Sequence, residues 1–355
     1  MKTRGVIYFT SFTFAYLDRA LVLADTLKKF NPNSFLVAIV CDILPETCNL
    51  LLDKLGFDAL IYAADLDIPS FEQWIFMHDI VEASTAIKGI FLDWVFTRGL
   101  HGKKVDKAIY LDPDIAVFSS LGFIEELLDE TSIVLTPHLL QPSDTVQGIL
   151  DNEISAMAHG TFNLGFLAVR NDPEGKRFAR WWGNRLRLFC YDDIARGLFT
   201  DQKWCDLVPC FFDKVKILRD LGANVASWNL SERNINISVD GRILVNDYTL
   251  RFFHFTKLGV IGDVMTMRYM GDNFSVLELW RWYKEQVARH SLDGLPKGYW
   301  FYGRYDNQAA IERQHRVLYR TRSDVQSAYP NPFAVEPGDS YYRWVQDEVL
   351  SGPDS

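Results

Sequence analysis

KAIYLDPDIAVF, residues 107–118, places an apolar run on each side of two aspartates. The first run, Lys107–Leu111, has the composition of a short buried β-strand. Side chains at positions i and i+2 of an extended segment point to the same side, so Asp112 and Asp114 can bind one hard divalent cation. Pro113 fixes the backbone between them and removes a competing donor. Open α/β sheets bind ligands at the carboxyl ends of their strands, so the pattern predicts a metal-assisted site there. An Asp-Pro turn without a metal is the simpler alternative.

Outward from this segment, β-rich apolar runs alternate with helical patterns, which is typical of βα units on a parallel sheet. We expect strands at 5–10, 35–41, 59–63, 107–111, 132–136 and 161–170, and a late strand pair within 243–256. We expect helices at 16–30, 44–55, 71–82, 84–99 and 172–191. The predicted class is therefore α/β, with a mostly parallel central sheet flanked by helices.

The composition of the sequence changes near Gly271, and the following segment is rich in aromatic residues and arginine. We expect residues 1–270 to form the main domain and residues 271–355 to form a C-terminal extension that packs on it. The segment at 277–290, LELWRWYKEQVARH, is predicted to be a helix. An alternative is peripheral membrane contact, in which Trp280, Trp282 and Tyr283 of this helix enter a membrane interface beside the arginines.

Composition excludes several classes of partner and location. The 355 residues carry 37 Lys and Arg against 46 Asp and Glu, a net charge of −9, which gives no global reason to bind nucleic acid. Five cysteines without a CxxC pattern indicate reduced thiols. Only five largely apolar residues follow Gly5, too few for a secretory leader, and no apolar run approaches the roughly 20 residues of a spanning helix. We therefore expect a cytoplasmic protein, with any membrane contact peripheral and on the inner face.

The loop after the first strand, Thr10–Phe14, reads TSFTF and contains neither GxGxxG nor GxxxxGK[ST]. Its sequence therefore excludes a dinucleotide dehydrogenase and a P-loop enzyme. The same loop lacks the glycine-rich stretch with arginine and lysine that sugar nucleotidylyltransferases carry. A phosphate-bearing ligand must be held in some other way.

IYLDPDIAVF resembles the D-x-D segment of the GT-A nucleotide-sugar glycosyltransferases. The order of the later motifs is similar to glycosyltransferase family 8, which includes glycogenin and bacterial lipopolysaccharide galactosyltransferases. In that family an Asn-x-Gly strand, an Asp-Gln pair and a late histidine follow, and here these are Asn163-Leu164-Gly165, Asp201-Gln202 and His254. The resemblance covers roughly residues 5 to 265. One departure is that the family's lysine-tryptophan ending after the histidine is missing, and Lys257 is the expected substitute.

The resemblance implies a GT-A fold with a Rossmann-like sheet in residues 1–270 and a metal site built from Asp112, Asp114 and His254. Two carboxylates and one imidazole favour Mn²⁺ over Mg²⁺, which rarely takes nitrogen. A histidine between aromatic residues in a strand is otherwise a buried core residue. The implied donor is a nucleotide diphosphate sugar, with a UDP-sugar favoured. The residues implied to bind this donor are Thr10, Asp42, Lys88, Asp112, Asn163, Gly165 and Lys257.

The resemblance also implies a retaining hexosyltransferase in which Asp201 binds a sugar hydroxyl and Gln202 lies near the anomeric carbon. The tail at 298–320 looks like the ending of bacterial surface-polysaccharide glycosyltransferases, so the implied acceptor is a glycan in surface polysaccharide synthesis. The polar loop at 141–153 is expected to contact that acceptor. An inverting transferase with Asp201 as base, and a GT-A-like domain that binds glycans or partners without turnover, are the alternatives. Each of these residues also has a structural alternative. Asp201 can be a charge that is favoured by a helix N-terminus, and Asp42 and Asn163 can be turn residues. Lys88 can be a solvated lysine on a helix.

Overall fold

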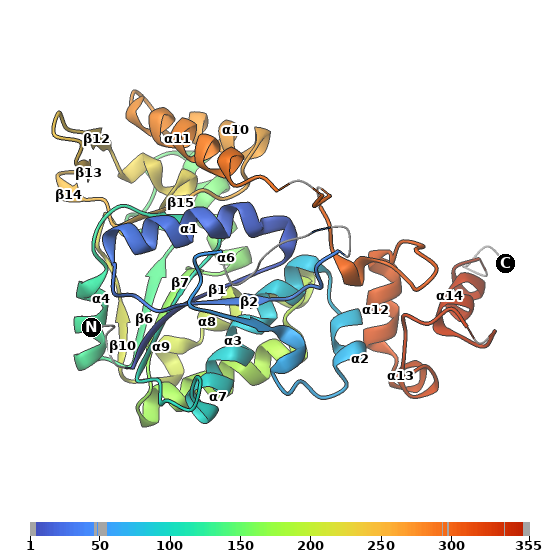
Figure 1. Cartoon of the computed structure of the whole chain (residues 1–355). Coiled ribbons are helices and arrows are strands. Elements are labelled where there is room, and N and C mark those ends of the chain that lie inside the picture. The colour runs from blue at the N-terminus through green and yellow to red at the C-terminus, as the bar shows by residue number, and fades with distance from the viewer. Residues whose placement is uncertain are drawn as a thin grey trace.

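The computed structural model describes residues 5–45, 48, 55–292, 294–296, 298–336 and 338–350 (Figure 1). Seven strands form the central sheet in the order β10-β6-β7-β4-β1-β2-β3, and β7 runs antiparallel to both of its neighbours while the other pairs are parallel. The strands are β1 Val6–Phe12, β2 Leu36–Val40, β3 Ala59–Tyr62, β4 Lys107–Leu111, β6 Ile133–Pro137, β7 Phe162–Arg170 and β10 Val215–Ile217. The predicted α/β class with a mostly parallel sheet is confirmed.

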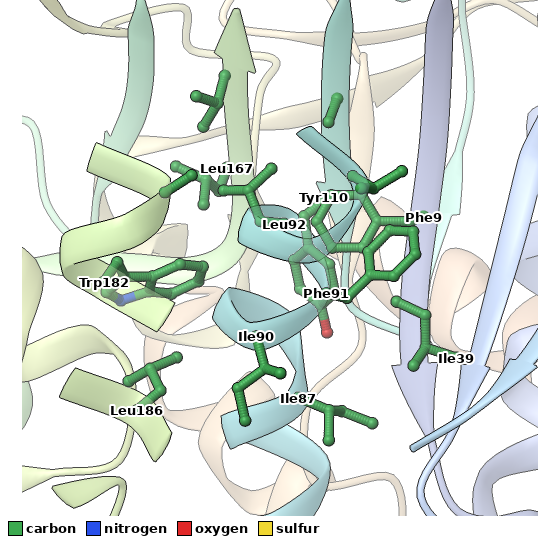
Figure 2. Close-up of a cluster of buried hydrophobic side chains, with 14 of the residues drawn as sticks. Phe9, Ile39, Ile87, Ile90, Phe91, Leu92, Tyr110, Leu167, Trp182 and Leu186 are labelled. Atoms are coloured by element: carbon green, nitrogen blue, oxygen red, sulfur yellow. The ribbon is translucent and has the colours of Figure 1, made fainter. Parts of the chain in front are cut away.

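Helices cover both faces of this sheet (Figure 1). Leu23 and Leu27 of α1, Leu17–Phe30, join the apolar cluster on one face. On the other face α3, Ile80–Arg98, lies beside α7, Pro173–Phe189, and both helices contribute side chains to the apolar cluster there. Figure 2 shows Phe91 of α3 beside Phe9 and Tyr110 of the sheet, with Trp182 of α7 on the far side.

The other helices are shorter or lie later in the chain. They are α2 Phe71–Phe76, α4 Gly122–Glu130, α5 Val146–Gly148, α6 Ile154–His159, α8 Gln202–Cys205, α9 Val208–Phe211, α10 Val260–Tyr269, α11 Ser275–Arg289, α12 Arg313–Thr321, α13 Ser323–Ala328 and α14 Tyr341–Leu350.

A second sheet brings a late part of the chain to the two aspartates. Its strands are β11 Val225–Ala226, β15 Phe252–His254 and β5 Ile115–Val117, in that order. Strand β5 begins directly after Asp114, and β15 pairs with it in antiparallel register so that His254 lies opposite Ile115. The backbone N–H of Phe255 also donates to the Asp114 carbonyl at 2.9 Å. Sheet pairing therefore fixes the distance between His254 and the D-x-D segment.

Two predicted element boundaries are corrected, and a third prediction falls largely outside the described residues. The helices expected at 71–82 and 84–99 instead separate at Met77–Asp79, because Asp79 accepts from the Glu82 backbone and Glu82 accepts from the Asp79 backbone, a capping box that starts α3. The late strand pair becomes β15 and a separate antiparallel sheet of β12 Ile235–Ile237, β13 Ile243–Val245 and β14 Tyr248–Thr249. The helix expected at 44–55 lies largely outside the described residues.

The first helix of the C-terminal segment, α11, is anchored by aromatic packing. Trp280 is 2% exposed, and Tyr283 is fully buried with its ring stacked 4.0 Å from Phe255. These two side chains belong to the apolar core, so they are not available to a membrane surface. Within the part of the chain that the structure describes, every helix is too short or too polar to traverse a bilayer.

Helix α12 ties the C-terminal segment to the junction between α2 and α3. Arg316 is 3% exposed and donates to the carbonyls of Phe76 and His78. Arg320 forms an ion pair with Glu82 at 3.1 Å, and the two side chains are 8% and 2% exposed. The first contact holds the segment that joins α2 to α3, and the second holds the first turn of α3.

Candidate functional site

Asp112, Asp114 and His254 form a cluster of metal-ligand type at the end of β4. One ligand atom from each lies within 4.8 Å of the others. His254 Nε2 is 3.0 Å from Asp114 Oδ1 and 3.7 Å from Asp112 Oδ2. Within the described ranges this is the one such group of three or more acidic, histidine or cysteine residues. Two carboxylate oxygens and one imidazole nitrogen can hold a divalent cation.

The second oxygen of Asp112 is held by neighbouring side chains. Tyr110 donates its hydroxyl to Asp112 Oδ1 at 2.6 Å, and Lys88 Nζ lies 3.0 Å from the same oxygen. Ser11 in turn contacts the Tyr110 hydroxyl at 3.0 Å. Because Oδ1 is held in this way, the other oxygen, Oδ2, faces His254.

Lys88 lies at the centre of a buried charge cluster. Its Nζ is 3.0 Å from Asp201 Oδ2 as well as from Asp112, and it lies over the Tyr110 ring at 4.6 Å. Lys88 reaches this place from α3, which packs closely against α7 where Gly89 of α3 meets Gly183 of α7. A Cβ at Gly183 would lie 2.7 Å from the Gly89 carbonyl oxygen. Lys88 is therefore a buried cation rather than a solvated helix lysine.

Burial and mutual charge shift the pKa values of this cluster. Burial lowers the pKa of Lys88, but Asp112 and Asp201 raise it, and the net pKa is well above the ordinary value. Burial raises the pKa of Asp114, whereas His254 lowers it, with a net downward shift. The pKa of His254 is lowered by burial and raised by Asp114 and Asp112, with a net upward shift. Burial also raises the pKa of Asp201, against the effect of Lys88.

The cluster lies in a cleft of about 390 Å³, and most of the sequence-predicted site residues line this cleft. These residues are Lys88, Asp112, Asp114, Asn163, Gly165, Asp201, Gln202, His254 and Lys257. Gln202 donates from Nε2 to the His159 carbonyl at 3.0 Å. Asp201 stands at the N-cap of the short helix α8, but its side chain makes no cap bond and pairs with Lys88 instead.

Thr10 and Asp42 are not among the residues that line the cleft. Thr10 is fully buried within β1, which continues to Phe12 and not only to residue 10 as predicted. Asp42 is 3% exposed and accepts from the backbone N–H groups of Phe14, Ile43 and Phe301, which joins the end of β2 to the C-terminal segment. Burial raises the pKa of this carboxyl to about 7. Its contacts are those of a carboxyl that ties loops together.

A smaller hollow of about 190 Å³ adjoins the cleft at the carboxyl end of β1. It shares Lys88, Asp112 and Asp114 with the cleft, and Thr13 and Tyr16 also line it. The two spaces therefore form one groove that passes over the three metal-ligand residues.

Sequence reasoning missed several cleft residues, among them His138 and Trp228. Trp228 donates from its ring nitrogen to the His138 carbonyl at 3.2 Å, and its ring lies at 83° to that of His254 with centroids 5.4 Å apart. Burial lowers the pKa of His138 to about 4, so this histidine is neutral near pH 7. His138 directly follows β6 and lies two residues after the predicted strand at 132–136, a position that could have indicated a site residue, whereas Trp228 carries no local signal.

The arrangement combines four chemical capabilities. A cation can be held by Asp112, Asp114 and His254, an anion can approach Lys88, and Gln202 offers an uncharged amide to a polar ligand. Trp228 offers an aromatic surface beside His254. Together they suit a ligand that carries both negative charge and hydroxyl groups.

Comparison with known proteins gives distant similarities. No protein-family model matches the chain. The uncharacterized protein YfnD of Bacillus subtilis (strain 168) is 28% identical over 156 residues, which are 43% of this chain and 47% of that protein. The matched segment thus spans about half the length of this curated relative.

Solved structures of glycosyltransferases are similar at lower identity. The galactosyltransferase LgtC in complex with donor and acceptor sugar analogs is 15% identical, with a TM-score of 0.45 over 82% of this chain and 98% of that chain. The glycosyltransferase GlyE of Streptococcus pneumoniae TIGR4 is 18% identical, with a TM-score of 0.42 over 80% and 64%. At these values the similarity assigns neither a family nor an activity, and the resemblance to family 8 stays a prediction.

Proposed function

We propose that this chain is a metal-dependent GT-A glycosyltransferase that moves a hexose from a nucleotide diphosphate sugar to a glycan acceptor. The observation that carries the proposal is the placement of Asp112, Asp114 and His254, with ligand atoms within 4.8 Å, beside the buried cation Lys88 in one cleft. A UDP-sugar is the favoured donor, and bacterial surface polysaccharide synthesis is the proposed setting. In this proposal residues 1–270 form the catalytic domain and residues 271–355 the extension.

The three metal-ligand residues fit Mn²⁺ or Mg²⁺, and Mn²⁺ is favoured because one ligand atom is an imidazole nitrogen. The cation would be held by Asp112 Oδ2, Asp114 Oδ1 and His254 Nε2. When bound, it supplies positive charge against the diphosphate that the reaction releases. Lys88 adds a fixed positive charge from the protein. Because Lys88 is buried, the attraction between this charge and the diphosphate is stronger than it would be in water.

In this proposal each part of the donor occupies one part of the groove. The nucleoside lies in the smaller hollow by Thr13 and Tyr16, the diphosphate crosses the metal ligands, and the hexose lies in the main cleft near Gln202. The acceptor then enters beside Trp228 and His138. The sharing of Lys88, Asp112 and Asp114 between the two spaces supports this order along the groove.

The proposed reaction proceeds with retention of the anomeric configuration. The bond between the anomeric carbon and the diphosphate oxygen breaks while the acceptor hydroxyl bonds to the same face of that carbon, and the hydroxyl proton passes to the leaving diphosphate. An amide is too weak a nucleophile for double displacement, so Gln202 stabilises the positive charge on the sugar instead. Asp201, 3% exposed and paired with Lys88, is poorly suited to be the base of an inverting reaction.

A thermal-shift screen tests the proposal. UDP, GDP, dTDP and CMP are each added with Mn²⁺, Mg²⁺ or EDTA, because a ligand specific to the native state raises its apparent stability. We expect one nucleoside diphosphate to raise the unfolding temperature in the presence of Mn²⁺ and to lose this effect in EDTA. The absence of a metal-dependent shift with all four nucleotides would contradict the proposal.

A further inference from the structure

Asn163 lies against the edge of His254 that faces away from the aspartates. Asn163 Oδ1 is 3.3 Å from His254 Nδ1, while Nε2 on the opposite edge is 3.0 Å from Asp114 Oδ1. A histidine that binds a metal through one ring nitrogen is oriented by the hydrogen bond of its other nitrogen. Asn163 therefore occupies the position of a group that orients a metal-binding histidine.

The other contacts of Asn163 determine which amide atom faces the ring. The backbone N–H of Gly165 donates to Asn163 Oδ1 at 3.2 Å, so the oxygen must lie on that side. The side chain of Asn224 donates to the same oxygen at 2.9 Å. On the far side Asn163 Nδ2 lies 3.3 Å from His138 Nε2, and since an amide nitrogen only donates, His138 accepts.

These contacts dictate where His254 carries a proton. The Asn163 oxygen accepts hydrogen bonds and cannot donate, so His254 Nδ1 must be its N–H donor. When His254 binds a metal as a neutral imidazole, the lone pair is then on Nε2, the nitrogen that faces Asp112 and Asp114. Asn163 thus selects the tautomer that the metal site needs.

The surroundings leave Asn163 little freedom for another role. Asn163 and Asn224 are 7% and 1% exposed. Asn224 has φ +53°, in the left-handed region that asparagine tolerates better than most residues, and this backbone delivers its amide to Asn163. A Cβ at Gly165 would lie 2.6 Å from His254 Nδ1 and 2.8 Å from Asn163 Oδ1, so only glycine leaves room for this contact.

We propose that Asn163 is a positioning residue for the metal site, and that the Asn-x-Gly sequence serves the histidine ligand and not the donor sugar. Asn163 fixes the orientation and protonation of His254, and Gly165 provides the space for its ring. This inference rests on the proposed function and deepens it, because it assigns a motif that the resemblance connects with the donor.

The test uses Mn²⁺ with UDP, a probe that contains no sugar. Asn163→Leu removes the acceptor for His254, and we expect it to weaken Mn²⁺ binding in the presence of UDP by about 10- to 100-fold, measured by the electron paramagnetic resonance signal of free Mn²⁺. Asn163→Asp keeps an oxygen at the same place, so its Mn²⁺ affinity in the presence of UDP should stay within about threefold of that of wild type. Such a result would show that the retained oxygen restores the affinity and that the site still folds. Ser227→Ala is the matched control, because it loses a buried hydrogen bond to Thr266 without touching His254.

If Asn163 contacts the sugar instead, Asn163→Leu will bind Mn²⁺ and UDP like wild type and lose affinity only for the UDP-sugar. That result would overturn the inference. A loss of Mn²⁺ affinity in Asn163→Asp equal to that in Asn163→Leu would also overturn it, since the retained oxygen would then have no effect.

A second measurement needs no metal. In protein labelled with ¹⁵N-histidine, wild type and Asn163→Asp should show a protected Nδ1–H signal of His254, assigned by its loss in His254→Gln, and Asn163→Leu should lose it. Absence of this signal in wild type overturns the inference. If the signal is present but wild type does not bind Mn²⁺ with UDP, the transferase proposal fails while the orientation of His254 by Asn163 stands.

Discussion

Gly165 and His254 are in such close contact that no side chain fits between them. A Cβ placed on Gly165 would lie 2.6 Å from both Cε1 and Nδ1 of the His254 ring. The edge of the His254 ring therefore packs directly against the backbone of β7. The metal-ligand cluster depends on the absence of a side chain at Gly165.

Gly165→Ala should displace the His254 ring and weaken metal-dependent nucleotide binding by at least about tenfold. Overpacking of this kind also lowers the free energy of unfolding by about 1–3 kcal/mol. Calorimetric titration of Mn²⁺ with UDP, together with urea denaturation, measures both effects. Gly122→Ala is the control, because a Cβ there meets only Ser120 Oγ at an ordinary 3.5 Å. Unchanged Mn²⁺ affinity in Gly165→Ala would contradict the role given to this contact.

Asp114→Asn should abolish metal-dependent donor binding, because it removes a negative charge from the ligand set while keeping the side-chain shape. We expect the affinity for Mn²⁺ with UDP to fall at least about 100-fold. Isothermal titration checks this, with the exposed Asp240→Asn as a control for loss of one charge. Normal binding and turnover by Asp114→Asn would end the metal assignment.

Gln202→Ala should separate binding from turnover. Gln202 lines the main cleft and is not one of the residues around the smaller hollow, so binding of UDP with Mn²⁺ should stay within about twofold. The rate of UDP release from the donor sugar should fall at least tenfold, or about 1.4 kcal/mol in the barrier. A weaker affinity for UDP with an unchanged rate would assign Gln202 to nucleotide binding instead.

Lys88→Met should destabilise the protein, because it leaves Asp112 and Asp201 without their buried cation. Loss of one partner of a buried ion pair costs about 3–5 kcal/mol of unfolding free energy. The double variant Lys88→Met with Asp201→Asn removes one of the stranded charges and should recover part of the loss, as measured by urea denaturation. Equal stability of the single and double variants would show that the two residues are not coupled.

Asp42 should make stability depend on pH. Burial raises the pKa of Asp42 in the folded protein to about 7 from an ordinary value of 3.8. The folded state therefore holds this proton more tightly, so the contribution of Asp42 to stability is full below about pH 4 and is lost as the pH rises towards 7. Asp42→Asn should remove this dependence, and urea denaturation at pH 5 and pH 8 compares the two proteins. Parallel pH profiles of wild type and variant would contradict this assignment.

Much of the fold could be predicted because its signals are local. Apolar β-rich runs such as Lys107–Leu111 locate six strands of the central sheet within one or two residues, whereas the short edge strand β10 was not predicted. The boundary between α2 and α3 lies at Met77–Asp79 and not at residue 83 as the sequence predicts, although the capping pair Asp79 and Glu82 is visible in the sequence. The apolar pattern of the sequence continues across this boundary and hides the end of α2.

The site was harder to predict because its contacts join distant parts of the chain. The pairing of β15 with β5 puts His254 beside Asp114, and only the order of motifs hinted at this. Asn163 could be selected by its motif, but its hydrogen bonds to His254 and Asn224 depend on three separate segments. Asp42 shows the opposite case: its position after a strand suggested a ligand, while its side chain accepts three backbone hydrogen bonds.

The buried ion pair between Arg320 and Glu82 joins residues 238 positions apart. Glu82 lies in the first turn of α3, the helix that also carries Lys88. At a synthesis rate of about 5–20 residues per second, roughly 12 to 48 s pass between the appearance of Glu82 and that of its partner. During that interval the start of α3 carries a carboxylate whose cationic partner has not yet been synthesised. The first turn of α3 therefore gains this buried ion pair late in the synthesis of the chain, and a ribosome that stalls before residue 320 leaves the pair unformed.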